Sequence, residues 1–330
     1  MKAALPRVCS DRTGLMATAA LLLAVQVSGA AAQSFPSRPI RLIVPFAPGG
    51  GNDIMGRFIA RKMSERIGQQ TIVDNRAGAD GIIGTEIAAR SAPDCYTILI
   101  ISTSYTQNAA IHKLPYDPVK SLTPISMVGT SPNVVYSAPG LLADTVQKLI
   151  ALAKSKPGAV RYASSGVGGF NHFGGELFNS MAGVKMTHVP YKGGGPSMVD
   201  VIGGQVEVGF GTLIQALSHL RSGKLRAIAV GSPRRSALMP DVPTISESGL
   251  PGYDCSVWWG IMGPAGLPGP IVTRLNAEIG AVMKDPEMAK RLQAEAAEPI
   301  IADPGALVRL ISSELEKWAR VAKETGIRAE

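Results

Sequence analysis

The chain has few aromatic residues, few cysteines and, after residue 32, no long hydrophobic run. Aromatic side chains make up 5% of its 330 residues, and its 3 cysteines exclude a small disulfide-stabilised scaffold. Because no later segment reaches about 18 consecutive apolar residues, we expect no membrane-spanning helix there. Glycine (37) and proline (24) are plentiful and 45% of the residues are hydrophobic, which indicates a folded protein with many short elements and turns.

Motifs of several enzyme classes are also missing. The sequence has no CxxC or HExxH motif, and its 4 histidines lack the spacing of metal ligands, so we expect no metal site. It has neither a P-loop nor the GxGxxG dinucleotide motif, and we expect no cofactor. The GxSxG motif of many serine hydrolases is absent, although a secreted hydrolase that uses Ser165 with a histidine stays an alternative.

The N-terminus has the three parts of a secretory signal. Three basic residues come first, an apolar run covers Leu15–Val27, and three alanines precede Gln33. We therefore interpret residues 1–32 as a signal peptide and expect a periplasmic protein. Removing its three basic residues and one acidic residue leaves 30 basic and 24 acidic residues, a net charge of +6. Since no run concentrates the basic residues, we expect no nucleic-acid partner.

Strand and helix patterns alternate along most of the remaining chain. Short apolar runs such as Ile40–Val44 and Tyr96–Ile101 predict buried strands, and the apolar residues of Asp53–Ile67 have helical spacing. Continuous apolar strands between helices are typical of an α/β fold whose parallel sheet is covered on both faces. The sequence therefore predicts that fold class.

Two Pro-rich stretches, Leu114–Pro124 and Pro240–Tyr253, separate one set of these elements from another. A late apolar strand follows the second stretch and needs a sheet to join. We therefore predict two lobes, the first formed by residues 33–133 plus 250–330 and the second by residues 134–249. Two chain crossings between lobes would form a hinge with an interlobe cleft.

Three glycine-rich loops follow predicted strands and precede predicted helices, namely Pro45–Asp53, Ala163–His172 and Tyr191–Pro196. Glycine lets backbone N–H groups approach a ligand closely. A helix N-terminus adds free donors and a partial positive charge, which suits a carboxylate or a phosphate. The first loop, taken alone, could equally be a plain connection between elements.

A resemblance to a known family is carried by nine segments that occur in this order: PSRPIRLIVPFAPGGGNDIMGR, DNRAGADGIIG, PDCYTIL, LPYDPVKSLTPI, RYASSGVGG, HVPYKGGGPSMVD, GKLRAIAV, DVPTISESGLPGY and WWGIMGPAGLP. Over nearly the whole mature chain, the sequence resembles the Bug-type extracytoplasmic solute receptors of tripartite tricarboxylate transporters. The resemblance implies a two-lobe, type II periplasmic binding protein fold. It also implies a non-enzymatic monomer that captures a small carboxylate and delivers it to membrane permease subunits.

The resemblance also implies which residues bind the ligand. In such proteins, the loops that match residues 46–52 and 164–169 grip a carboxylate, and residues 191–193 match a third cleft segment. Together with other strand ends of the same kind, this gives the ligand-binding prediction Phe46, Ala47, Gly49, Gly50, Asn52, Ser104, Ser164, Ser165, Gly166, Gly169, Tyr191, Lys192, Gly193, Gly211 and Thr212.

Some positions depart from the family pattern. Gly211 stands where many relatives have an aspartate, so a ligand amino group would lack that acidic partner. In the family fold, Cys95 and Cys255 precede neighbouring strands that run in opposite directions, so we expect these cysteines to lie at opposite ends and stay unpaired. A liganded form that docks on a signalling receptor instead of a permease is a further alternative.

Overall fold

The computed structural model describes residues 1, 4, 35–191, 193–294 and 296–328. The chain consists of two compact units, Met1–Ser37 and Arg38–Glu330. The fold described in this subsection is that of the second unit. The predicted signal peptide, residues 1–32, lies almost wholly outside the described residues. Within the described part, no helix combines the length and the apolar character needed to cross a bilayer.

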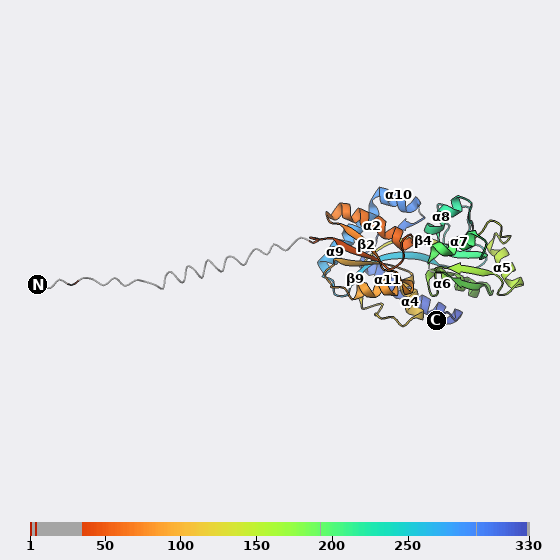
Figure 1. Ribbon diagram of the computed structural model, residues 1–330, viewed down its shortest axis with the longest axis horizontal. Helices are drawn as coiled ribbons and strands as arrows, with labels where there is room; N and C mark the ends of the chain where they lie inside the picture. The colour runs from red at the N-terminus through yellow and green to blue at the C-terminus, as the bar shows by residue number, and fades with distance from the viewer. Residues whose placement is uncertain (2–3, 5–34, 192, 295, 329–330) are drawn as a thin grey trace. The chain divides into compact units, whose positions relative to one another are not determined.

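One half of the fold is a sheet whose strands lie in the order β2 (Thr71–Asn75), β1 (Ile40–Val44), β3 (Thr97–Ser102), β9 (Ser256–Pro264) and β4 (Leu122–Ser137) (Figure 1). β1 pairs in parallel with both β2 and β3. β3 and β9 are antiparallel, with Leu99 opposite Met262. The carboxyl ends of β1 and β3 therefore point to the same edge of the sheet.

The other half continues the same sheet from β4 through β7 (Val208–Thr212), β5 (Arg161–Ser164) and β6 (Thr187–Pro190), while β8 (Arg226–Val230) pairs with the opposite edge of β4. β5 is parallel to β6 and β7. β4 is antiparallel to β7 and β8. The carboxyl ends of β5, β6 and β7 consequently share one edge, as those of β1 and β3 do in the first half of the sheet.

β4 is the long strand that belongs to both halves. Its residues 122–132 pair with β9, and its last five residues pair with β7 and β8. Beside it, the backbone N–H of Gly231 donates to the Asn133 carbonyl at 2.8 Å, and the Cys255 N–H donates to the Gly231 carbonyl at 2.7 Å. The predicted boundary at residue 134 falls inside β4, so the chain passes it as an uninterrupted strand. The lobe limits themselves stay a prediction.

The expectation of a parallel sheet is wrong in the middle of the fold, where β4 and β9 are antiparallel to their neighbours. An apolar strand buried on both faces looks the same in sequence whichever way it runs. β4 itself went unrecognised because it contains Pro124 and Pro132, which favour a loop interpretation. Its register with β9 shifts between Pro124 and Ser126, at the kind of irregularity where a strand tolerates proline.

Helices pack on both halves of the sheet (Figure 1). Those of the first half are α2 (Gly51–Ile67), α3 (Ile82–Ala89), α4 (Ser104–Ile111), α9 (Gly269–Lys284), α10 (Pro286–Ala294) and α11 (Pro304–Thr325), with the short helix η2 (Ala79–Gly81) and the strand β10 (Glu298–Pro299). Those of the second half are α5 (Val146–Ser155), α6 (Phe170–Ala182), α7 (Gly194–Ile202) and α8 (Leu213–Arg221). The predicted helix 53–67 is confirmed and ends at Gly68, whose φ of 69° is left-handed.

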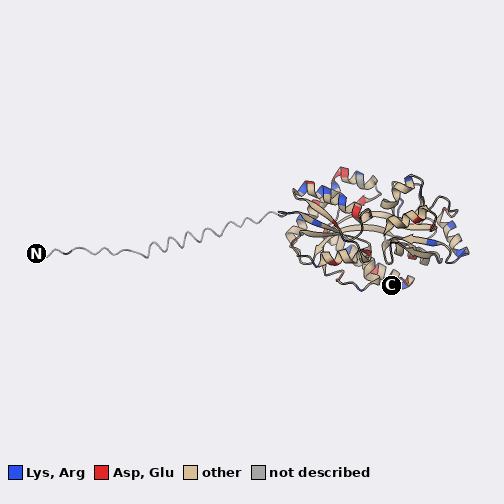
Figure 2. Cartoon of the chain, viewed as in Figure 1, with Lys and Arg blue, Asp and Glu red and all other residues tan. Residues whose placement is uncertain are grey.

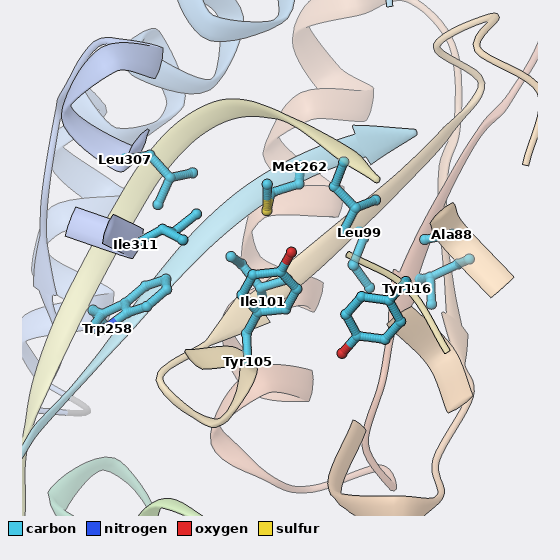
Figure 3. Close-up of a cluster of buried hydrophobic side chains, with 11 residues drawn as sticks. Ala88, Leu99, Ile101, Tyr105, Tyr116, Trp258, Met262, Leu307 and Ile311 are labelled. Carbon is cyan, nitrogen blue, oxygen red and sulfur yellow. The ribbon is translucent and has the colours of Figure 1, made fainter. Parts of the chain in front are cut away.

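A buried apolar cluster fixes β3 and β9 against α3, α4 and α11 (Figure 3). Leu99 and Met262 come from the strands, and Leu307 and Ile311 come from α11. Trp258 belongs to the same cluster and is 4% exposed. Burial of each such side chain contributes about 1.5–3 kcal/mol, so this cluster holds the strand ends firmly in place.

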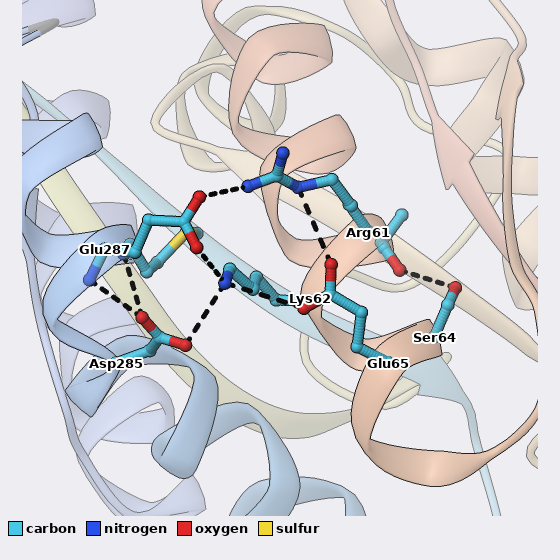
Figure 4. A network of polar contacts seen from close by, with 8 residues as sticks. Arg61, Lys62, Ser64, Glu65, Asp285 and Glu287 are labelled. Atoms are coloured by element: carbon cyan, nitrogen blue, oxygen red, sulfur yellow. Dashed lines mark hydrogen bonds and ion pairs between the residues drawn. The ribbon is translucent and has the colours of Figure 1, made fainter.

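A charged network joins α2 to α10 (Figure 4). The Lys62 ammonium lies 2.5 Å from a Glu287 carboxylate oxygen and 3.3 Å from one of Asp285. Arg61 also contacts Glu287, at 2.9 Å. The hydrogen bond to Glu287 raises the pKa of Lys62. Elsewhere, charged residues are spread over helices of both halves, which agrees with the absence of basic runs in the sequence (Figure 2).

Both described cysteines are free and buried. Cys95 precedes β3 and Cys255 precedes β9, and these two strands are antiparallel neighbours. The thiols therefore lie at opposite ends of the strand pair, as expected. Burial raises the pKa of the Cys95 thiol to about 11, which keeps it protonated at neutral pH.

Candidate functional site

The loop between β1 and α2 is held in place by a buried aspartate. The Asp53 carboxylate accepts hydrogen bonds from the Gly49 N–H, Arg57 Nε and Asn75 Nδ2, each at 2.9 Å. Asn75 Nδ2 also donates to the Phe46 carbonyl at 3.0 Å. Burial alone would raise the pKa of Asp53, but these hydrogen bonds outweigh it and hold the pKa below its usual value. The loop is thus fixed by charge-assisted bonds.

Asn52, in the first turn of α2, is held by two side-chain hydrogen bonds. Its Oδ1 accepts a hydrogen bond from Trp259 Nε1 at 2.7 Å, and its Nδ2 donates to the Ser102 hydroxyl at 3.3 Å. A side chain at Gly51 would begin 3.3 Å from the Trp259 ring. Trp259 therefore faces the loop while Trp258 packs in the apolar cluster, because adjacent residues of a strand point to opposite faces of the sheet.

The start of α8 lies directly across from the start of α2. A side chain at Gly51 would begin 3.4 Å from Ile214 and 3.8 Å from the Thr212 hydroxyl. One at Gly50 would begin 3.6 Å from the Gln215 amide nitrogen. A loop of the first half thus meets a strand end of the second half.

Gln215 joins a third segment to this meeting point. Its Oε1 accepts a hydrogen bond from the Thr212 hydroxyl at 3.0 Å. The same oxygen lies 2.9 Å from where a side chain at Gly194 would begin. Glycine at position 194 therefore lets the first turn of α7 approach the first turn of α8.

In the loop between β5 and α6, two adjacent serines have different partners. The Ser164 hydroxyl lies 2.6 Å from His188 Nε2. The Ser165 hydroxyl accepts from Asn171 Nδ2 at 3.2 Å, and the Ser165 carbonyl accepts from the Gly193 N–H at 3.0 Å. The second and third predicted loops are therefore neighbours, joined by main-chain hydrogen bonds.

Two stacked histidines support this second loop. The rings of His172 and His188 lie 3.8 Å apart, and His172 Nδ1 accepts from the Gly168 N–H at 3.0 Å. Burial lowers the pKa of His172 to about 4. Burial, with a smaller contribution from His172, lowers the pKa of His188 to about 3. Both rings are neutral at physiological pH and act as hydrogen-bonding supports of the loop.

These contacts do not favour the hydrolase alternative. In the part of the chain that the structure describes, no hydrogen bond joins Ser165 to a histidine. The histidine contact belongs to Ser164, which is buried and also donates to the Gly166 carbonyl at 3.1 Å. A His188 with so low a pKa is a weak general base.

The second loop also lies against the first half. A side chain at Gly169 would begin 3.1 Å from an Asp80 carboxylate oxygen. At the next residue, Gly81, an added side chain would begin 3.2 Å from the Phe46 ring. The hydroxyl of Ser104, the first residue of α4, interacts with the Asp80 carboxyl. The predicted residues Phe46, Ser104 and Gly169 are thus brought around one turn.

Other predicted residues are placed differently. The Tyr191 hydroxyl donates to Asp200 at 2.6 Å, so it is engaged with α7, and burial raises its pKa to about 12. A side chain at Gly211 would begin 2.9 Å from the buried Tyr136 ring, so Tyr136 occupies the space beside this glycine. Ala47 is exposed, and Lys192 lies outside the described residues.

Four helices begin at this site without a side-chain cap. Their N-caps are Gly50 for α2, Gly169 for α6, Gly193 for α7 and Thr212 for α8, and in none does a side chain accept a bond from the helix. Elsewhere, Thr145 caps α5 and Asp303 caps α11 through their side chains, whereas α9, which begins after Pro268, also lacks a side-chain cap. Uncapped N–H groups are therefore gathered where the loops of the two halves meet.

The comparisons with known proteins identify the family. The model of the tripartite tricarboxylate transporter family receptor matches residues 55–327. The chain belongs to this receptor family. BugT of Bordetella pertussis is 38% identical over 323 residues, which cover 96% of this chain and 99% of BugT. The resemblance inferred from the sequence is confirmed.

Two solved structures show the same fold. An R. palustris protein solved with adipate is 33% identical, with a TM-score of 0.86 over 89% of this chain and 99% of that protein. MatC from Rhodopseudomonas palustris, solved with bound malate, is 30% identical, with a TM-score of 0.82 over 87% of this chain and 99% of MatC. The two-lobe periplasmic binding protein fold expected from the resemblance is confirmed for this receptor.

Sequence reasoning missed two residues of the receptor's candidate site and passed over a third. Gln215 lies one turn after Thr212, and a polar residue in the first turn of a helix that follows a candidate strand end could have been noticed. Asp80 was visible only as part of a glycine-rich turn. Nothing in the sequence marks His188, because it lies inside the strand that precedes the third glycine-rich loop and not in the loop itself.

The receptor also has a cavity away from these loops. Its volume is about 300 Å³, and its lining includes Pro132, Leu238, Gln293 and Glu298. It shares no residue with the site described above. Among the described residues, no group of three or more His, Cys, Asp or Glu side chains could hold a metal ion.

Proposed function

We propose that this protein is a periplasmic receptor that captures a small carboxylate between its two lobes for a tripartite tricarboxylate transporter. The observation that carries the proposal is the set of uncapped helix N-termini from both halves at one place. Relatives support the ligand class, since solved structures of similar proteins carry adipate and malate.

The proposed recognition uses backbone rather than basic side chains. The first N–H groups of α2 and α6 would donate to one ligand carboxylate, and each helix adds the positive end of its dipole. Ser165 and Thr212 supply hydroxyl groups beside them. A hydrogen bond to a charged group contributes about 1.5–3 kcal/mol, so a few such bonds, less the cost of association, are compatible with micromolar capture.

Closure would follow from the two passages of chain beside Asn133, which we propose as the hinge between lobes 33–133 plus 250–330 and 134–249. Ligand contacts made by both lobes exist only when the lobes are together, so binding shifts the population toward the closed form. The liganded monomer would then present a surface formed by both lobes to the permease subunits. No bond of the ligand is broken in this account.

The test is thermal unfolding of residues 33–330 with a panel of mono-, di- and tricarboxylates. The protein is first unfolded in denaturant and refolded, which removes any ligand that was purified with it. At 100 times its dissociation constant, a ligand stabilises the folded state by about 2.7 kcal/mol, and a selective rise in the melting temperature is the expected result. A panel without any stabilising member would contradict the proposal.

A second experiment addresses the transporter. Cells that carry the permease subunits should take up the stabilising carboxylate only when this receptor is also present. Equal uptake with and without the receptor would contradict the proposed role in transport but not carboxylate binding.

A further inference from the structure

Asp80 lies between the two lobes, and its carboxyl is not one of the groups that would bind the ligand carboxylate. It forms the middle of η2, with a left-handed φ of 48°. One of its carboxylate oxygens lies 3.1 Å from the start of any side chain at Gly169, the N-cap of α6. The following residue, Gly81, packs against Phe46 of the first loop. Asp80 therefore stands beside both glycine-rich loops.

The Asp80 carboxyl is incompletely satisfied by the protein. Ser104 is its side-chain hydrogen-bond partner. Its Oδ2 is buried and has no hydrogen-bond partner among the described residues. A buried carboxylate oxygen without a donor costs free energy, and burial accordingly raises the pKa of Asp80 to about 7.

Amide side chains of α4 and α6 add further acceptors. Asn108 Nδ2 donates to the Asp80 carbonyl at 2.9 Å, and this leaves Asn108 Oδ1 buried without a partner. On α6, Asn171 Nδ2 donates to Ser165, which leaves Asn171 Oδ1 in the same situation. Gln107 adds one unpaired amide nitrogen, which carries two N–H donors, and one unpaired amide oxygen. The unsatisfied groups of these elements are mainly acceptors.

An excess of buried acceptors indicates that a donor belongs among them. An ammonium group brings three N–H donors and a positive charge, and a carboxylate brings only further acceptors. Tyr116, which interacts electrostatically with Asp80, has a pKa raised far above neutrality, mainly by burial, and carries no positive charge. The described residues supply no cation for this carboxyl.

We propose that Asp80 determines specificity by pairing with a protonated amino group, so that the captured ligand carries both an amino group and a carboxylate. This inference rests on the proposed function, because the carboxylate end would be held by the glycine-rich loops. Asp80 Oδ2 and Asn108 Oδ1 accept hydrogen bonds from the ammonium group. Gly169 allows α6 to approach closely enough to close over the pair.

The test compares ligands that differ at a single group. The panel contains the common amino acids and ω-amino acids, each with a partner that lacks only the amino group, such as aspartate against succinate and 6-aminohexanoate against hexanoate. Affinities are measured by calorimetry on the refolded protein. We expect the wild type to bind at least one amino member about 10-fold or more tightly than its partner.

The variant Asp80→Asn removes the charge and keeps a residue that tolerates a left-handed backbone. We expect it to lose about 10-fold or more in affinity for the amino member while its affinity for the partner is unchanged or higher. Its melting temperature should be equal to or above that of the wild type, because an unpaired buried carboxyl is removed. The exposed Asp241→Asn is the control for net charge and should change neither affinity.

The outcomes separate this inference from the proposed function. Carboxylate binding in which the wild type prefers members without an amino group would overturn the role of Asp80 and leave the receptor function intact. If Asp80→Asn lost the same affinity for both members of a pair, the role of Asp80 would also be overturned and the receptor function would stand. Failure of every member of the panel to bind the wild type would contradict the receptor function itself.

Discussion

The two glycine-rich loops present helix N-termini in the same way but are supported by different chemistry. The loop before α2 is fixed by an ion pair and charge-assisted bonds around Asp53. The loop before α6 is fixed by neutral groups, namely the stacked rings of His172 and His188, which bond the Gly168 N–H and the Ser164 hydroxyl respectively. Both helices nevertheless begin at an extended glycine without a side-chain cap.

The difference shows which part of each loop is free to vary. The N-cap must leave its N–H groups open to a ligand, so both loops use glycine there. The support lies behind the backbone, where an aspartate or a histidine can hold the chain equally well. The two supports should nonetheless respond differently to mutation and to pH.

The largest effect is expected for Gly50→Leu. Its side chain would begin 3.6 Å from Gln215 and fill the space between the starts of α2 and α8. We expect the affinity for the stabilising carboxylate to fall by about 100-fold or more, with little change in the melting temperature. Gly140→Leu, at an exposed position with open space, is the matched control. Unchanged affinity in Gly50→Leu would remove this loop from the site.

Asp53→Ala should come next, because it deletes the ionic support of the first loop. It leaves the Gly49 N–H without its acceptor and removes one of the two acceptors of Asn75 Nδ2. We expect a loss of about 1–3 kcal/mol in the free energy of unfolding, measured with urea. Ligand affinity should also fall, since the loop is no longer fixed. A variant as stable as the wild type would show that the loop does not depend on Asp53.

A smaller effect is expected from mild acid, and it should act on the second loop. The pKa values of His172 and His188 are lowered to about 4 and about 3, so between pH 6.5 and 4 the unfolded chain binds protons that the folded chain does not. Stability should therefore fall as the pH falls through that window. The contribution of Asp53, whose pKa is also lowered, persists until the pH falls below about 4.

His188→Gln tests this assignment, because glutamine can bond Ser164 but does not titrate. Melting temperatures measured from pH 7.5 to 4.5 should fall less steeply in this variant than in the wild type. Identical slopes would mean that other groups cause the acid sensitivity of the protein.

The smallest effect is expected for Lys62→Met in the network between α2 and α10. Glu287, its nearest partner, is largely exposed, and ion pairs at the surface contribute little. Thermal unfolding should show a slight loss of stability, and titration with the ligand should show an unchanged affinity. A loss of affinity comparable to that of Asp53→Ala would show that α10 controls the position of α2.

The sequence predicted the strand ends that carry the site better than the sheet that holds them. β1, β6 and the helix after Gly50 were recognisable because apolar runs and glycine punctuation are local signals. β4 was not recognisable, because Pro124 and Pro132 favour a loop interpretation and the partners of this strand lie far away in the sequence. α4 also escaped, since Gln107 and Asn108 are buried polar residues and leave no apolar periodicity to detect.

The site residues show the same limit. The uncapped glycines could be inferred from local chemistry and from the family resemblance. The position of Asp80 beside Gly169 could not, because it depends on how the two halves of the chain meet. The engagement of Asn52 with Trp259 likewise joins residues more than 200 positions apart.

Hydrogen exchange of the backbone amides, measured by mass spectrometry with and without the stabilising carboxylate, tests the central claim most directly. The account predicts that the ligand slows exchange in both loops, at residues 49–53 and 165–172, and leaves the cavity near Leu238 and Gln293 unchanged. Protection confined to that cavity, or to one loop alone, would contradict a ligand held between the two uncapped helix starts.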